Sequence, residues 1–399
     1  MEIKGKYATA VCYAKETEPA ALEQIRAMCD QPFTEGCRVR IMPDVHAGKG
    51  CTIGTTMTVR GKAVPNVVGV DIGCGMYTTK LGNRTPDFGR VDEACHRIPG
   101  GMNVWESPRE PFDLEQFRCF RKLQNKTWLQ NSLGTLGGGN HFIEIDRSED
   151  GTYWLVIHSG SRNLGKQVCE YYQQLAVDIA DGRADSAEAS ALIARLKAEG
   201  RQKEIQAELE ALRTRQNLRT VPDSLCHLEG QHLEDYLHDV KICQEFAVRN
   251  REIMAELILK ETGMECLESF HTVHNYIDTD EMILRKGAIA AHAGERVLIP
   301  INMRDGSVIA IGRGNEEWNC SAPHGAGRLM SRKKALETLS LEDYRAAMEG
   351  IYTTTANRGT LDEAPMAYKR MEDIIDVIRE TVDIVEIIRP VYNYKASDL

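Results

Sequence analysis

The sequence has little that would suit a secreted or membrane-bound protein. The first residues, Met1–Lys6, lack the apolar stretch of a signal peptide, and no run is long and apolar enough to span a membrane. The twelve cysteines are dispersed, and no two of them form a Cys-x-x-Cys pair. We therefore expect reduced thiols, most of them small buried apolar residues, in a cytoplasmic protein.

Basic residues are outnumbered by acidic ones. The chain carries 49 Lys and Arg against 59 Asp and Glu, a net charge of -10, which excludes broad electrostatic adhesion to nucleic acid. A local basic pocket is still compatible with this charge, because several cations gather near glycine-rich segments. These are Arg162 and Lys166, Arg285 and Lys286, and Arg328 with Arg332, Lys333 and Lys334. A polyanionic substrate would accordingly be held at one place.

The organisation of the chain predicts one mixed α/β domain over residues 1–399. Its hydrophobic fraction of 42% and charged fraction of 27% are those of an ordinary soluble globular protein. There is no internal repeat, no long linker and no clear boundary. From residue 184 to 218 the composition shifts to Ala, Glu, Leu, Arg and Gln, which predicts a helical hairpin inserted into the domain.

Hydrophobic periodicity places the other elements. The expected strands are residues 38–42, 56–60, 64–70, 77–80, 142–145, 154–157 and 384–391, with further strands between 283 and 311. The expected helices are residues 19–29, 114–129, 234–259, 341–350 and 371–381, and another helix follows residue 162. The glycine-rich segments thus fall at strand ends and in the loops after them, where active sites are usually built.

Short segments that carry a histidine or a cysteine, most of them with glycines, recur along the chain. They are Met42–His46, Gly69–Gly75, Gly137–His141, His158–Arg162, His274–Tyr276 and Ser321–Arg328. Each offers a metal ligand or a nucleophile, and glycine, where present, allows the backbone to approach a ligand closely. Taken singly, each histidine is more simply a hydrogen-bonded structural residue. So many in one chain favour a single shared site.

Five of these side chains predict a metal site. Asp71 and Cys74 lie three residues apart in a turn closed by glycines, so both could face one cavity, and a thiolate can bridge two cations. His141, His158 and His274 follow at wide spacing. Cysteine with several histidines favours borderline transition metals over magnesium alone. Five ligands would suit a two-metal site, which stabilises both the attacking and the leaving oxygen.

His324 has a different setting. Gly325 and Gly327 remove bulk around it and Arg328 supplies a cation, which suits a nucleophile that attacks phosphorus. The glycines 137–139 could offer backbone N–H groups to phosphate oxygens, although the Gly-Lys-Ser/Thr of a Walker A motif is missing. Arg162, at a helix start, could add bidentate phosphate contacts. The combination indicates nucleotidyl or phosphoryl transfer.

Together these segments resemble the RtcB family of RNA ligases, from about Ile41 to Lys395. The resemblance implies a mixed α/β catalytic domain with sheets around a central metal cleft. It also implies an enzyme that depends on GTP and on two Mn²⁺ ions. Such an enzyme joins RNA ending in a 3′-phosphate or 2′,3′-cyclic phosphate to RNA with a 5′-hydroxyl, in RNA repair or tRNA splicing.

The resemblance also implies roles for particular residues. His324 would become guanylylated and pass the guanylate to the RNA 3′-phosphate. One metal would be held by Cys74, His158 and His274, and the other by Asp71, Cys74 and His141. The implied nucleotide contacts are Asn140, Glu144, His324, Gly325, Ala326, Gly327, Tyr368 and Lys395. The implied phosphate or RNA contacts are Arg162, Lys286, Arg328 and Arg332.

The sequence departs from the family pattern in one loop. After Val297–Pro300 the family usually continues Gly-Ser-Met-Gly, whereas this chain reads Ile301-Asn-Met-Arg304. This loop and the shorter chain favour a paralogue devoted to repairing damaged RNA. Two alternatives stay open: a dinuclear metallophosphoesterase that opens cyclic phosphates without ligation, and a non-catalytic RNA-binding protein. The need for an activating partner such as archease, the oligomeric state and the metal bound on purification are also left open.

Overall fold

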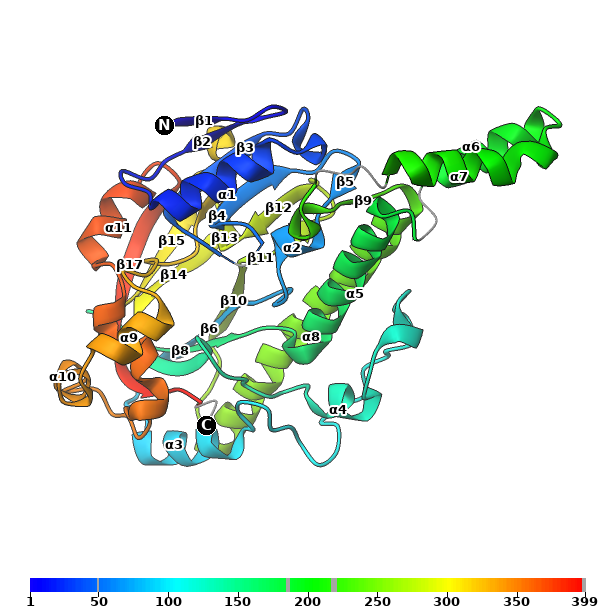
Figure 1. The fold of residues 1–399 in the computed structure, drawn as a ribbon. Coiled ribbons are helices and arrows are strands. Elements are labelled where there is room, and N and C mark those ends of the chain that lie inside the picture. The colour runs from blue at the N-terminus through cyan, green and yellow to red at the C-terminus, as the bar shows by residue number, and fades with distance from the viewer. Residues whose placement is uncertain (49, 184–186, 217–220, 397–399) are drawn as a thin grey trace.

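The structure, a computed structural model, describes residues 1–48, 50–183, 187–216 and 221–396 (Figure 1). Two sheets form its framework. The six-stranded sheet has the order β1 (Glu2–Lys4), β2 (Thr9–Cys12), β3 (Val39–His46), β4 (Ile53–Thr58), β12 (Ile283–Lys286), β11 (Asn275–Asp278). The seven-stranded sheet has the order β10 (Glu268–Val273), β6 (Gly75–Gly82), β8 (Tyr153–Ser159), β7 (Phe142–Arg147), β17 (Val382–Tyr394), β15 (Gly306–Gly312), β14 (Arg296–Asn302).

Two short strand pairs and a set of helices complete the fold. The pairs are β13 (Ala288–Ala290) with β16 (Ser321–Pro323), and β5 (Lys62–Ala63) with β9 (Leu228–Glu229). The helices are α1 (Pro19–Cys29), α2 (Pro65–Val68), α3 (Phe88–Arg97), α4 (Lys126–Asn131), α5 (Arg162–Ala180), α6 (Ala187–Ala198), α7 (Ile205–Gln216), α8 (Gly230–Thr262), α9 (Arg332–Thr338), α10 (Leu341–Ala347) and α11 (Met371–Ile378). Among the described residues, no helix is long and apolar enough to cross a membrane.

The seven-stranded sheet curls until its two edge strands meet. The backbone N–H of Leu298 on β14 donates to the hydroxyl of Thr272 on β10 at 3.0 Å. Side chains on the inner face form an apolar cluster that includes Trp154, Val156 and Ile388. Strand β8 lies inside this sheet and is buried along its whole length, as expected for a strand covered on both faces. His158, near its end, is therefore held on rigid backbone.

Helix α8 connects the two main cores. Its residues Leu233, Val240 and Phe246 pack in the large core that also contains side chains of the six-stranded sheet. Roughly two to three turns further on, Met254 and Ile258 pack on the outer face of β7 and β8. Because a helix presents a new face every few residues, one long helix can serve two cores. Figure 1 shows α8 running beside α5 along the body of the molecule.

Two buried polar side chains of α8 tie down the loops at the strand ends. The Asn250 carboxamide oxygen accepts the backbone N–H groups of Gly134 and Thr135 at 2.7 and 3.0 Å. Its amide group donates to Thr135, Ser159 and Gly160. The guanidinium of Arg251 donates to the carbonyls of Gly73 and Ser159. The backbone around Cys74, His158 and the glycine-rich loop is thus fixed from one helix.

The mixed α/β class is confirmed, and most predicted elements are present. Within the range predicted for the inserted hairpin, α6 and α7 pack against each other and project from the body (Figure 1). Residues 184–186 and 217–218 of that prediction lie outside the described residues. The assignment of residues 1–399 to one catalytic domain stays a prediction.

Two predicted elements are wrong. Residues 64–70 contain the short helix α2 instead of a strand, because Pro65 starts a helical turn and Gly69, at φ 97°, ends it. Residues 114–129 form a loop with a single 3₁₀ turn and the start of α4. There the backbone N–H groups of Arg118 and Cys119 donate to the Asp239 carboxylate of α8. A tertiary contact satisfies donors that a helix would have satisfied locally.

Removing the Asn250 carboxamide should destabilise the fold strongly. In Asn250→Ala several buried N–H and C=O groups lose their partner, so we expect the free energy of unfolding to fall by about 3 kcal/mol or more. Urea unfolding followed by circular dichroism measures this loss. The exposed Glu245 on the same helix supplies the control Glu245→Ala, which should change stability by less than about 0.5 kcal/mol. A loss below 1 kcal/mol in Asn250→Ala would contradict the assigned role.

Candidate active site

A cleft of about 350 Å³ collects side chains from most of the chain. Its lining contains most of the residues singled out in the sequence: Asp71, Cys74, Asn140, Glu144, His158, His274, His324, Gly325, Ala326, Gly327, Arg328, Arg332, Tyr368 and Lys395. These residues lie up to 324 positions apart, from 71 to 395. The fold therefore brings the separate glycine-rich segments to one place.

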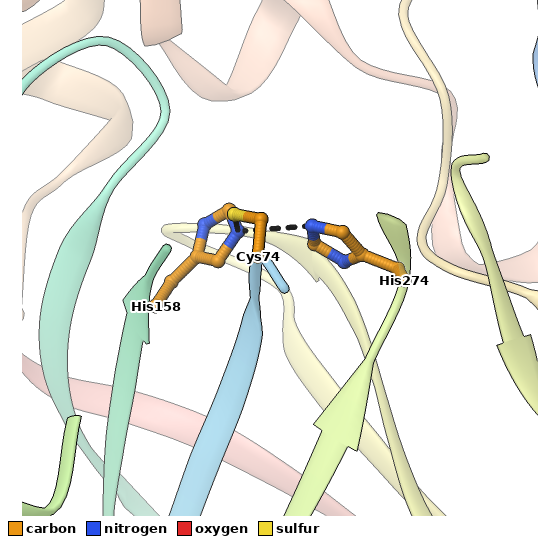
Figure 2. A group of neighbouring side chains, drawn as sticks. All are labelled: Cys74, His158 and His274. Atoms are coloured by element: carbon orange, nitrogen blue, oxygen red, sulfur yellow. Dashed lines mark hydrogen bonds between the residues drawn. The ribbon is translucent and has the colours of Figure 1, made fainter. Parts of the chain in front are cut away.

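Cys74, His158 and His274 form a compact buried group (Figure 2). The Cys74 Sγ lies 3.2 Å from the His158 Nε2, and that nitrogen lies 3.4 Å from the His274 Nε2. Cys74 precedes β6, His158 lies on β8, and His274 joins β10 to β11. As Figure 2 shows, all three side chains point toward a common centre.

A second group shares Cys74 with the first. The Cys74 Sγ lies 3.5 Å from the His141 Nε2, which lies 3.2 Å from the Asp71 Oδ2. The ligand-type atoms of Asp71, Cys74 and His141 are all within 4.8 Å of one another. The thiol therefore lies where it could bridge two cations, each with one further set of imidazole or carboxylate ligands.

Backbone carbonyls orient two of the imidazoles. The Nδ1 of His141 lies 2.8 Å from the carbonyl of Leu136, and the Nδ1 of His158 lies 3.0 Å from that of Asn140. Only a protonated Nδ1 can donate to a carbonyl oxygen, so the lone pair is left on Nε2. In both rings that Nε2 faces the cysteine. This is the arrangement that metal-binding histidines usually have.

Glycine is required at Gly160, beside this group. A Cβ at this position would lie 2.0 Å from the Asp71 Oδ1, and such an overlap would force the carboxylate away from His141. Gly327, beside His324, has a similar constraint, because its Cβ would lie 2.8 Å from the carbonyl oxygen of Asp44. These two glycines allow the functional segments to pack closely.

Burial sets the protonation of the group. It lowers the pKa of His158 and of His274 well below the usual range, and the neighbouring imidazoles add to this effect. It raises the pKa of the Cys74 thiol, as does the charge of Asp71. For Asp71 burial acts in the same upward direction, but the hydrogen bonds to His141 and Cys74, together with the charges of the neighbouring imidazoles, outweigh it and the pKa falls to about 2. The site thus combines neutral imidazoles at His158 and His274 with an ionised carboxylate.

His324 lies at the edge of the metal-type cluster. Its ring centroid is 5.0 Å from that of His274. Its Nδ1 lies 2.7 Å from the Oδ2 of Asp44, whose side chain is fully buried on β3. This carboxylate was not singled out in the sequence, although it belongs to the segment Met42–His46. The hydrogen bond holds the ring in one orientation and leaves Nε2 as its free nitrogen.

The lining of the cleft also contains two buried carboxyl groups. Glu144 on β7 accepts a hydrogen bond from Asn393 at 2.7 Å. Burial raises its pKa to about 7, although Asn393 and Lys395 oppose the shift. Glu363 accepts from Lys395 and Tyr368. Burial alone would raise the pKa of Glu363, yet Lys395, Arg332 and Arg328 lower it overall.

Three predicted site residues lie behind the lining. His141 belongs to the Cys74 group, as described above. Arg162 donates to the carbonyl of Gly101 and to Thr135, and Lys286 donates to the carbonyl of Asn66. The wall of the cleft does contain the divergent segment Ile301–Met303.

Three further histidines have other surroundings. His46 lines the cleft beside His324 and contacts the Asp44 carbonyl. His271 stacks on Tyr77, away from the cluster. His292 forms a separate group with Asp278 and Glu281. The buried Arg285 guanidinium lies 3.9 Å from both carboxylates, so this group already contains a cation.

Comparisons with known proteins agree with the geometry. Residues 24–107 and 116–396 match the family model described as tRNA-splicing ligase RtcB. The chain belongs to the RtcB family. It is 31% identical to the RNA-splicing ligase RtcB of Escherichia coli strain K12, with 94% of this chain and 93% of that protein covered. It is 27% identical to the tRNA-splicing ligase RtcB of Aeropyrum pernix, with 84% and 83% covered.

This RtcB family member also has site residues that the sequence reading missed. Asp44 and Glu363 were not assigned, and neither was Asn393. Asp44 carried a signal, because it stands two residues before His46 in a segment that the sequence had singled out. Glu363 and Asn393 carried none, because they meet their partners only through tertiary contacts.

Glu144 should give the protein a measurable pH dependence of stability. Its pKa in the folded protein is about 7, against 4.5 for an ordinary glutamate. The folded state therefore binds more protons between these values, and stability falls as pH rises through this window, by up to about 3 kcal/mol. Burial also raises the pKa of the neighbouring Asp146, so Glu144→Gln should reduce this loss without abolishing it. Glu149→Gln, at an exposed position, should keep the whole loss. Unfolding free energies at pH 5, 6, 7 and 8 measure the effect. Parallel curves for the wild type and Glu144→Gln would contradict it.

Proposed function

We propose that this chain is a GTP- and manganese-dependent RNA ligase. It would join RNA ending in a 3′-phosphate or 2′,3′-cyclic phosphate to RNA with a 5′-hydroxyl, in RNA repair or tRNA splicing. Membership of the RtcB family establishes the class, RNA ligase. The observation that carries the proposed chemistry is the position of His324. It shares a cleft with the cysteine–histidine cluster and is oriented by a buried carboxylate.

His324 would act as the nucleophile. Asp44 holds the Nδ1 proton, so Nε2 carries the lone pair that attacks the α-phosphorus of GTP, and pyrophosphate leaves. The RNA 3′-phosphate then takes the guanylate from the histidine. Finally the 5′-hydroxyl attacks the activated 3′-phosphorus and GMP leaves. The guanylate gives the RNA 3′-phosphate the leaving group, GMP, that it lacks by itself.

The residues of the cluster fit a pair of transition-metal ions. Cys74, His158 and His274 would hold one ion, and Asp71, Cys74 and His141 the other. When bound, the ions would supply charge neutralisation at the phosphate oxygens. A donor set of one sulfur, three imidazoles and one carboxylate suits Mn²⁺ less well than zinc or cobalt, so manganese dependence would reflect the chemistry and availability more than affinity.

Another part of the cleft would hold the nucleotide. Glu144 could accept the N–H groups of a guanine edge, with Tyr368 and Lys395 beside it. Asn140 and the glycines after His324 would lie along the phosphates. Arg328 and Arg332 would contact phosphate oxygens of nucleotide or RNA, for which guanidinium geometry is well suited. Arg162 and Lys286 lie behind the side chains that line the cleft. In this assignment they would reach phosphate only from that position.

The nucleophile can be tested directly. With α-labelled GTP and Mn²⁺, the wild-type chain should acquire acid-labile label, and His324→Ala should acquire none. Asp44→Asn should label about 10²- to 10⁴-fold more slowly, because the ring loses its orienting carboxylate. His96→Ala, at an exposed position, is the control and should label normally. A wild-type protein that binds metal but never labels would overturn the GTP mechanism and favour the esterase alternative.

Metal stoichiometry tests the cluster. The wild type should bind two Mn²⁺ per chain, and Cys74→Ala should bind none at the same concentration because both sites share the thiolate. His141→Ala should keep one ion. Titration followed by electron paramagnetic resonance distinguishes these cases without any ligation assay. Two ions retained in Cys74→Ala would contradict the shared ligand.

A further inference from the structure

One buried carboxylate, Glu363, meets four of the side chains that the proposed function assigns to nucleotide or phosphate. Its Oε1 lies 3.0 Å from the Arg328 Nη1 and 2.7 Å from the Arg332 Nη1. Its Oε2 accepts from the Tyr368 hydroxyl at 2.5 Å and from the Lys395 Nζ at 3.1 Å. The Glu363 side chain is only 2% exposed. Both oxygens of this carboxylate therefore contact side chains that the proposed function assigns to nucleotide or phosphate.

The partners of Glu363 come from three separate parts of the chain. Arg328 follows the His324 segment, Arg332 begins α9, and Lys395 follows β17. Glu363 itself ends the 3₁₀ helix Arg358–Glu363, whose start is fixed by a capping box between Asn357 and Thr360. A rigid turn thus places one carboxylate between these segments, in addition to the backbone hydrogen bonds that join residues 327–329 to residues 367–369.

Charge makes this contact necessary. Arg328, Arg332 and Lys395 bring three positive charges together, and Lys395 is only 3% exposed. Asp362 offsets part of this charge through Arg332, at 2.8 Å. Without Glu363 the three cations would repel one another, and the buried ammonium would lack its counter-charge.

We propose that Glu363 is a positioning residue that holds Arg328, Tyr368 and Lys395 in place for the nucleotide. The proposal rests on the proposed function, because it takes the GTP site as given. It goes beyond that site by naming a group that touches no substrate and acts through three others. It also explains why a glutamate lies in a cleft meant for a polyanion: it is fully engaged by cations, which leaves the cluster positively charged.

Guanylylation kinetics of Glu363→Gln test this. We expect the KM for GTP to rise roughly 10- to 100-fold, since the cations lose their common anchor. The maximal rate of labelling at saturating GTP should change much less than the KM, because the hydrogen bond between His324 and Asp44 is kept. Glu349→Gln, at an exposed position, is the matched control.

A second variant separates positioning from folding. Glu363→Asp keeps the charge but shortens the reach, so its KM should rise less than that of Glu363→Gln. A Glu363→Gln variant that labels with the wild-type KM would overturn the proposal, as would one whose maximal rate falls while its KM is unchanged. A wild-type chain that never labels would instead overturn the proposed function and the role of Glu363 with it.

Discussion

The geometry of the cleft depends on hydrogen bonds between side chains of α8 and the backbone of other segments. The metal-type cluster brings sulfur and nitrogen atoms to within 3.2–3.5 Å of one another, although its members lie on four different loops and strand ends. Loops without support could not keep such distances, because each would gain entropy by relaxing. Asn250 and Arg251 supply the support by hydrogen-bonding the backbone on both sides of the cluster.

Arg251 adds an electrostatic role to this structural one. Burial lowers its pKa to about 10, and the proximity of Cys74 and Asp71 limits the shift. The fixed positive charge of Arg251 near the Cys74 thiol and the Asp71 carboxylate favours their ionised forms, which are the forms that bind metal. The same side chain therefore orients the ligand loop and counters the repulsion between its two anionic groups.

Two groups of side chains in the cleft suit ligands of opposite charge. In one group, acceptor atoms with lone pairs converge and would suit a cation. In the other group, cations converge on one carboxylate and would suit an anion. His324 lines the same cleft as both groups: its ring centroid is 5.0 Å from that of His274, and Arg328 belongs to the same lining. A nucleophile placed there could meet a phosphorus atom whose oxygens are neutralised by metal ions and by cationic side chains.

The sequence was most informative where chemistry and backbone constraint coincide. Cys74 and His158 could be recognised because glycines flank them, and glycine marks backbone that must pass close to other atoms. Glu363 and Asn393 could not, because ordinary residues flank them and their partners are distant in sequence. Residues 114–129 were mistaken for a helix for the same reason: the Asp239 carboxylate that replaces the helical hydrogen bonds lies over 100 residues away.

In the divergent loop, a local change of sequence leaves recognition of the base to other residues of the site. The carboxamide oxygen of Asn302 accepts the N–H groups of Arg304 and Asp305, and its amide group donates to Asp305. This side chain is therefore engaged by its own turn, even though it lines the cleft. In the proposed function, recognition of the base then rests on the opposite wall, on Glu144 and on Lys395, which Glu363 holds.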